Sequence, residues 1–310
     1  MLGGLALRCL EGCAAHPLNS QPWEARLRGA TVVLLGEVHD NAEHHRQRSA
    51  VLRRALQAGW RPAVVMEQFD TDHQADIERS RMERPLDAQH LIATAGAPRG
   101  WDWSHYAEPI ALILRFDLPL FAGNLPRALA TRLTREEVAA VLGAERTREL
   151  GLNEAPDAQW QAAQEREIDL GHCGALPRSA LAGMARAQFA RDAVMAQLLR
   201  EHAARGAVLL AGTGHVRRDI GVPRWLGALP SQGAALPQNA SPGVQRNLDT
   251  ASVLAVGFIE ADAQVPAPNR FDAVVIAAPA QRDDPCEAFK ARPQRLADEI
   301  GRRRVGKECA

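Results

Sequence analysis

The sequence predicts an α/β fold with a mainly parallel central sheet flanked by helices. Three observations lead to this prediction. Short apolar runs recur along the chain, helical patterns separate most of them, and no internal repeat is visible. Continuous apolar strands indicate a sheet that is buried on both faces, and the alternation of strands with helices indicates parallel βαβ units.

Each predicted strand is an apolar run of strand length bounded by polar, Gly or Pro residues. The predicted strands cover residues 31–36, 62–69, 119–123, 207–213, 252–259 and 273–278. The predicted helices cover residues 43–56, 70–83, 101–116, much of 133–167, and 178–205. The helices of 133–167 form a helical insertion after the third strand. Only a Pro-containing loop separates the last two strands, so we expect this C-terminal pair to be antiparallel.

The predicted domain covers residues 31–280, between an N-terminal segment at 1–30 and a C-terminal tail at 281–310. The start, "LGGLALRCLEGC", is a degenerate version of a lipoprotein signal. Arg8 interrupts its apolar core, and Glu11 lies where a small residue should precede Cys13. An ordinary N-terminal helix is the alternative interpretation. Residues 228–247 are rich in Pro, Gly, Gln and Ser and predict a long loop.

The composition bears on nucleic-acid binding, membrane contact and disulfide bonds. The formal net charge is 0, so nothing indicates nucleic-acid binding and we expect no such partner. No run approaches the roughly 20 apolar residues of a membrane-spanning helix, so membrane contact is expected only through a lipid anchor. The five cysteines contain no CxxC pair and predict no disulfide framework.

Polar side chains follow four of the predicted strands, where each strand ends. They are Glu37, His39, Glu67, Asn124, Arg127 and His215. Because ligands of open α/β sheets bind at the carboxyl ends of the parallel strands, we expect these groups to meet at one edge. The alternative for any one of them is a carboxylate that only caps the next helix.

The long helix at 178–205 carries two polar residues on an otherwise apolar stripe. Gln188 and Asp192 fall among apolar residues at steps of three and four. An unpartnered buried carboxylate is costly, so Asp192 should have a partner. Arg191, Arg186 or a histidine at the sheet edge could provide it. The helix then either faces a ligand site or contains a satisfied ion pair.

A metal site is a further hypothesis for the sheet edge. Two imidazoles and two carboxylates suit Zn, Mn or Fe(II), and the candidate ligands are Glu37, His39, Glu67 and His215. The compact HExxH motif and the GxSxG elbow are both absent. His44 and His45 are neighbours on one helix, so at most one of them should face inward.

Seven segments, taken together, resemble a known family. In order they are "LLGEVHDNAEHH", "VVMEQF", "WDWSHY", "GNLPR", "GHCGALP", "ARAQFARDAVMA" and "GTGHVRRDIGVPRWL", spanning about residues 34–226. This order and spacing resemble the ChaN-like haem-binding uptake proteins. Their superfamily also includes the Tiki and TraB proteins and the erythromycin esterases. The resemblance implies an α/β fold, a bacterial role in haem or iron uptake, and a homodimer that encloses paired haems.

The resemblance also implies a tyrosinate iron ligand, which in this chain is Tyr106, the only tyrosine. The alternative interpretation is that Tyr106 is a core residue. The other candidate haem contacts are His105, Asn124, Arg127, Gln188, Arg191, Asp192, His215 and Arg218. The arginines among them would also bind another carboxylate-bearing small molecule. The implied location is periplasmic or outer-membrane-associated, and a cytoplasmic location is the alternative because the signal is incomplete.

An enzyme is the rival hypothesis, so catalytic activity is left open. A hydrolase of esterase or peptidase type, with or without a metal, would use Glu37, His39, Glu67 and His215. A glutamate would act as general base toward water, and a histidine would transfer the proton. The resemblance to the erythromycin esterases supports this alternative.

Overall fold

The computed structural model describes residues 23–95, 100–227, 252–263, 267, 269–284 and 286–287. Most of the predicted N-terminal segment and C-terminal tail, and all of the loop predicted at 228–247, lie outside the described residues. No helix in the described ranges is long and apolar enough to cross a membrane.

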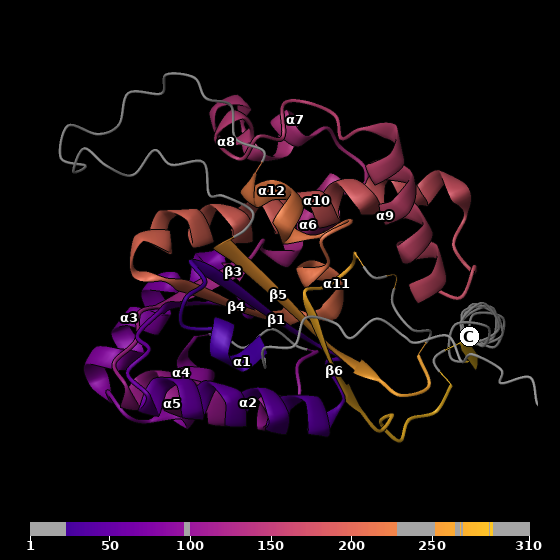
Figure 1. Ribbon diagram of the computed structural model, residues 1–310. Coiled ribbons are helices and arrows are strands. Elements are labelled where there is room, and N and C mark those ends of the chain that lie inside the picture. Colours follow the sequence, from indigo (N-terminus) through magenta and orange to yellow (C-terminus); the bar gives the residue numbers. More distant parts are fainter. Residues whose placement is uncertain are drawn as a thin grey trace, which may run out of the picture.

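The core of the fold is a parallel sheet, as the sequence predicts (Figure 1). Its strand order is β3-β2-β4-β1-β5-β6, and every neighbouring pair is parallel. The strands are β1 (Val32–Glu37), β2 (Ala63–Asp70), β3 (Leu120–Asn124), β4 (Ala207–Gly212), β5 (Val253–Glu260) and β6 (Ala273–Ala277). The central strand β1 is buried along its whole length, which explains its unbroken apolar run up to Gly36.

The predicted antiparallel pairing of the last two strands is wrong, because β5 and β6 are parallel. Val256 of β5 pairs with Ala273, the first residue of β6, so β6 begins opposite the middle of β5. The chain therefore has to return by only about four residues, or roughly 13 Å at about 3.3 Å per residue. The link 261–272 has enough residues to cover this distance.

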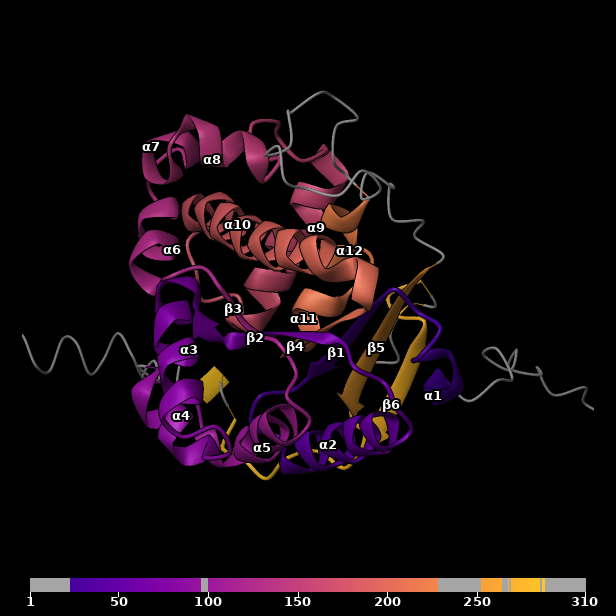
Figure 2. The same cartoon turned by 90° about the vertical axis from the view of Figure 1, so that its left-hand side faces the viewer.

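Helices cover both faces of the sheet (Figures 1 and 2). One face carries α1 (Trp23–Arg26), α2 (Ala42–Gln57), α3 (Gln74–Glu83), α4 (Ala88–Thr94), α5 (Ala107–Arg115) and the short 3₁₀ turns η1 (Thr71–His73) and η2 (Trp103–His105). The other face carries α6 (Arg127–Leu133), α7 (Val138–Leu142), α8 (Ala144–Glu149), α9 (Ala158–Gly171), α10 (Arg178–His202), the 3₁₀ turn η3 (Ala203–Arg205) and α12 (Val222–Leu226). The short helix α11 (Thr213–Val216) follows β4 directly. Each face has its own apolar core, so side chains from alternate strand positions enter different cores.

A disulfide bond joins Cys173, after α9, to Cys286 near the end of the described chain. The cysteine spacing did not predict this bond. The two residues are 113 positions apart, and the bond fixes the segment after β6 to the helical layer. Cross-linking over so long a loop removes much of the entropy of the unfolded chain.

Candidate functional site

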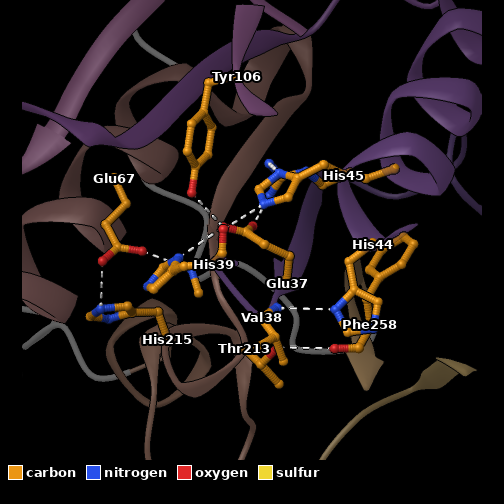
Figure 3. Close-up of polar contacts among 12 residues, drawn as sticks. Glu37, Val38, His39, His44, His45, Glu67, Tyr106, Thr213, His215 and Phe258 are labelled. Carbon is orange, nitrogen blue, oxygen red and sulfur yellow. Dashed lines mark hydrogen bonds and ion pairs between the residues drawn. The ribbon is translucent and has the colours of Figure 1, made fainter. Parts of the chain in front are cut away.

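The carboxyl ends of β1 to β4 form one edge of the sheet, which we call the rim. Glu37 ends β1, and it is buried. Its Oε1 accepts a 3.1 Å hydrogen bond from the Tyr106 hydroxyl and lies 3.0 Å from His39 Nδ1 (Figure 3). Its Oε2 pairs with the guanidinium of Arg48. Glu37 is therefore a fixed carboxylate at the centre of three partners.

Arg48 supplies the charge that balances Glu37. It lies in α2, its side chain is fully buried, and its guanidinium is 5.9 Å from the centre of the Tyr106 ring. Burial lowers the pKa of Arg48 to about 10, so the group stays cationic at neutral pH. A second contact, from Nη2 to His45 Nδ1 at 3.3 Å, orients the guanidinium.

Tyr106 is fully buried beneath the rim. Burial raises the pKa of its phenol above the usual value, although Arg48 partly offsets the effect. The hydroxyl is thus neutral, and it donates to Glu37. A tyrosinate ligand must be ionised and accessible from solvent. In this arrangement the Tyr106 hydroxyl is neither.

His39 is the exposed member of the rim. Its side chain is 46% exposed, and its ring meets Trp101 edge-on at 4.7 Å between ring centres. The ring also lies against Gly212 at the end of β4, where an added Cβ would come within 2.8 Å of Nε2. Nδ1 is bound to Glu37, and among the described residues Nε2 has no hydrogen-bond partner. Nε2 of His39 is therefore available for a ligand.

A second cluster joins β2, α10 and α11. His215 Nδ1 lies 2.5 Å from Asp192 Oδ1, and its Nε2 lies 3.3 Å from Glu67 Oε1 (Figure 3 shows the Glu67 contact). The other oxygen of Glu67 accepts a 2.7 Å hydrogen bond from the backbone N–H of Gly212. The prediction that buried Asp192 needs a partner is thus met by a rim histidine.

The charges of this cluster favour an imidazolium between two carboxylates. Burial lowers the pKa of His215, but Glu67 and Asp192 outweigh burial and raise it to about 10. Burial opposes ionisation of Glu67, yet His215 holds the pKa of that carboxyl well below its usual range. Burial raises the pKa of Asp192 to about 6. His215 therefore carries a proton at neutral pH and is a poor general base.

A third group continues the rim toward β3. Asn124 Nδ2 donates a 2.7 Å hydrogen bond to Asp70 at the end of β2, and Arg191 Nη1 donates a 2.8 Å bond to Asn124 Oδ1. The backbone N–H of Arg127 points to the same Asp70 at 3.4 Å. Gln188, on α10 like Arg191, lies 3.1 Å from His215 Nε2 and so belongs to the second cluster.

Residues 23–226, more than half of the chain, match one family model, described as haem-binding uptake, Tiki superfamily, ChaN. The chain belongs to the ChaN family. This confirms the resemblance that the sequence motifs indicated. No curated protein matches the chain.

One solved structure with a TM-score above 0.5 shows the same fold. ChaN of Campylobacter jejuni, described by its cofacial haem binding, has a TM-score of 0.57 at 17% identity, over 81% of this chain and 89% of that chain. A variant of the erythromycin esterase EreC in its open conformation has a TM-score of 0.40 at 14% identity, over 79% and 74% of the two chains. A Bacillus cereus protein has a TM-score of 0.36 at 10% identity, over 84% and 73%.

Two of the candidate haem contacts lie in different parts of the fold. Arg218 does not belong to the rim, because its Nη2 binds Asp272 at 2.6 Å and the carbonyl of Val253, the first residue of β5, at 2.7 Å. This places it toward the amino ends of the strands. His105 does lie near the rim, and its ring stacks on His45 at 4.6 Å between ring centres.

The predicted metal site is not supported. In the described part of the chain, no group of three or more His, Cys, Asp or Glu side chains is arranged to hold a metal ion. The reason is that the carboxylates already have partners. Glu37 is bound by Arg48 and Tyr106, and Glu67 is bound to His215.

The expectation that only one of His44 and His45 faces inward is wrong, since both are buried. The two side chains point to different sides of α2, and both sides are covered. His44 packs toward Phe258 of β5 and accepts a 3.2 Å hydrogen bond from the backbone of Val38. His45 lies under His105 and contacts the carbonyl of His39 at 2.9 Å, so both imidazoles hold the β1–α2 turn that carries His39.

Sequence reasoning missed Arg48, which fixes Glu37. A signal was present, because Arg48 lies at helical spacing from His44, Val51 and Leu52, and all four are buried. A buried arginine on such a stripe indicates a buried carboxylate partner. The contact of Trp101 with His39 depends on tertiary packing and has no local signal in the sequence.

Proposed function

We propose that this protein binds haem and takes part in haem uptake. Membership of the ChaN family carries the proposal. The observation on the chain itself is the half-exposed His39 imidazole beside Trp101. A haem site needs an iron ligand and an apolar wall for the porphyrin, and these two side chains have the required chemistry. Arg191, on the same rim, is a cation of the kind that binds propionates.

Ferric haem titration of the purified protein tests the proposal. We expect a saturable change in the Soret band at micromolar haem. His39→Ala should weaken binding, whereas His202→Ala should not, because His202 ends α10 close to the amino end of β4, at the opposite edge of the sheet. A wild-type protein that leaves haem in its free spectral form at these concentrations would refute the proposal.

The proposal includes export from the cytoplasm. It also includes the homodimer and the lipid anchor that the resemblance to ChaN implies. The Cys173–Cys286 disulfide supports export, because such bonds persist in oxidising compartments and are rare in the cytosol. Thiol labelling in intact cells, followed by mass spectrometry of the two cysteine peptides, tests this part. Linked peptides without a reductant are expected. Freely alkylated Cys173 and Cys286 would contradict export.

Hydrolysis is the second candidate function, and the Glu37–His39 contact favours it. A carboxylate that orients an imidazole through Nδ1 leaves Nε2 to act as general base toward water. Protonated His215 and the Gly212 backbone N–H, both bound to Glu67, lie beside this imidazole. A panel of ester substrates tests this candidate: a wild-type rate lost in both Glu37→Gln and His39→Ala supports it, and rates equal in all three proteins exclude it.

A further inference from the structure

We infer that His39 is the iron ligand of this protein and that Tyr106 acts on it through Glu37. The inference rests on the proposed haem binding and names the ligand. It differs from the tyrosinate ligation that the resemblance implies. Each histidine and tyrosine near the rim has a different set of contacts, and these contacts decide which one can bind iron.

The other candidate ligands are occupied. The Tyr106 hydroxyl is buried and donates to Glu37. His215 has a carboxylate at each ring nitrogen, at 2.5 and 3.3 Å. His45 binds Arg48 through Nδ1 and the carbonyl of His39 through Nε2.

Two further imidazoles near the rim are also unsuitable. His44 is fully buried, and its Nδ1 accepts from the Val38 backbone. His105 has one ring face covered by His45, and its Nε2 lies 3.7 Å from Asp102. Among these side chains, His39 alone combines a half-exposed ring with a ring nitrogen that has no partner in the described chain.

The contact with Glu37 fixes which nitrogen of His39 is available. A carboxylate at 3.0 Å from Nδ1 holds the proton on that nitrogen, so Nε2 keeps its lone pair. Iron-binding histidines in proteins commonly donate their second N–H to a carboxylate or carbonyl in this way. A hydrogen bond from Nδ1 to a carboxylate also strengthens the imidazole as a donor to iron, which favours ferric over ferrous iron.

Glu37 is itself tuned by buried groups. Arg48 balances its charge, and Tyr106 donates to the same Oε1 that faces His39. Because Tyr106 and His39 both hydrogen-bond to this oxygen, the bond from Tyr106 weakens the bond from His39. It is therefore a positioning residue for His39, and its hydroxyl affects the iron without touching it.

The experiment compares haem-loaded wild type with His39→Ala, Tyr106→Phe and Glu37→Gln, and uses His202→Ala as matched control. Electron paramagnetic resonance and resonance Raman spectra report the ligand, and redox titration reports the potential. Wild type and His202→Ala should show a histidine-ligated ferric spectrum. His39→Ala should lose this signature and bind haem about tenfold or more weakly, and added imidazole should restore the signature.

The two positioning variants separate the roles. Tyr106→Phe should keep the histidine signature with a lowered potential, and Glu37→Gln should keep it with a raised potential. A tyrosinate signature in wild type that Tyr106→Phe removes, or an unchanged spectrum in His39→Ala, overturns the inference while haem binding stands. A wild type that binds no haem overturns the proposed function and the inference together.

Discussion

The hydroxyl of Tyr106 donates a 3.1 Å hydrogen bond to Glu37 Oε1, the oxygen that also faces His39 Nδ1. The only tyrosine of the chain is thus joined to the exposed imidazole through a buried carboxylate. The buried contacts that hold Glu37 in place therefore also hold the imidazole that we propose as the iron ligand.

Replacing Arg48 should strongly destabilise the protein. Arg48→Ala leaves the buried carboxylate of Glu37 without its cation, which typically costs about 3–5 kcal/mol of unfolding free energy. Arg46→Ala is the matched control on the same helix, because Arg46 is 72% exposed and pairs with Glu43 at the surface. Its effect should be below about 1 kcal/mol. Urea unfolding compares the two, and equal losses would contradict the buried ion pair.

Tyr106 should resist ionisation while the protein is folded. Burial raises the pKa of its phenol above the ordinary value of about 10. Because the chain contains one tyrosine, the absorbance of tyrosinate near 295 nm reports this residue alone. At pH 10 we expect no ionisation in folded protein and about half ionisation in denaturant. An ionised phenol at or below pH 10, with the fold intact, would contradict its burial beneath the rim.

The His215 cluster should make stability depend on pH in the alkaline range. The pKa of His215 is about 10 when folded and about 6.5 when unfolded. A raised folded pKa means that this contribution is fully present below about pH 6.5 and is lost as the pH rises toward 10. Unfolding free energies of wild type should fall over this window, and those of His215→Gln should fall less. Parallel curves for the two proteins would exclude the ion cluster.

Gly212 should be required for the position of His39. A Cβ at residue 212 would lie 2.7 Å from His39 Cε1, so Gly212→Ala forces the imidazole to move. Haem affinity should fall. Gly214→Ala is the control, since a Cβ there meets no atom within 4 Å. Equal affinities for both variants, measured by Soret titration, would show that the imidazole position does not matter for haem.

The sequence predicted those features that depend on local pattern and on the cost of burial. Strands such as β1 are unbroken apolar runs because both faces of the sheet are covered, and Asp192 needed a partner because a buried lone carboxylate is costly. The direction of β6 was not predictable, since a loop without periodicity decides it. The burial of His44 and His45 depends on β5 and η2, which cover both sides of α2.

One atom of the protein should hold the haem iron. Crystals of the haem-loaded protein, measured at the iron absorption edge, locate that atom directly. We expect an anomalous iron peak within bonding distance of His39 Nε2, with Tyr106 still donating to Glu37. An iron peak bonded to the Tyr106 oxygen, or placed away from the rim, would contradict this expectation.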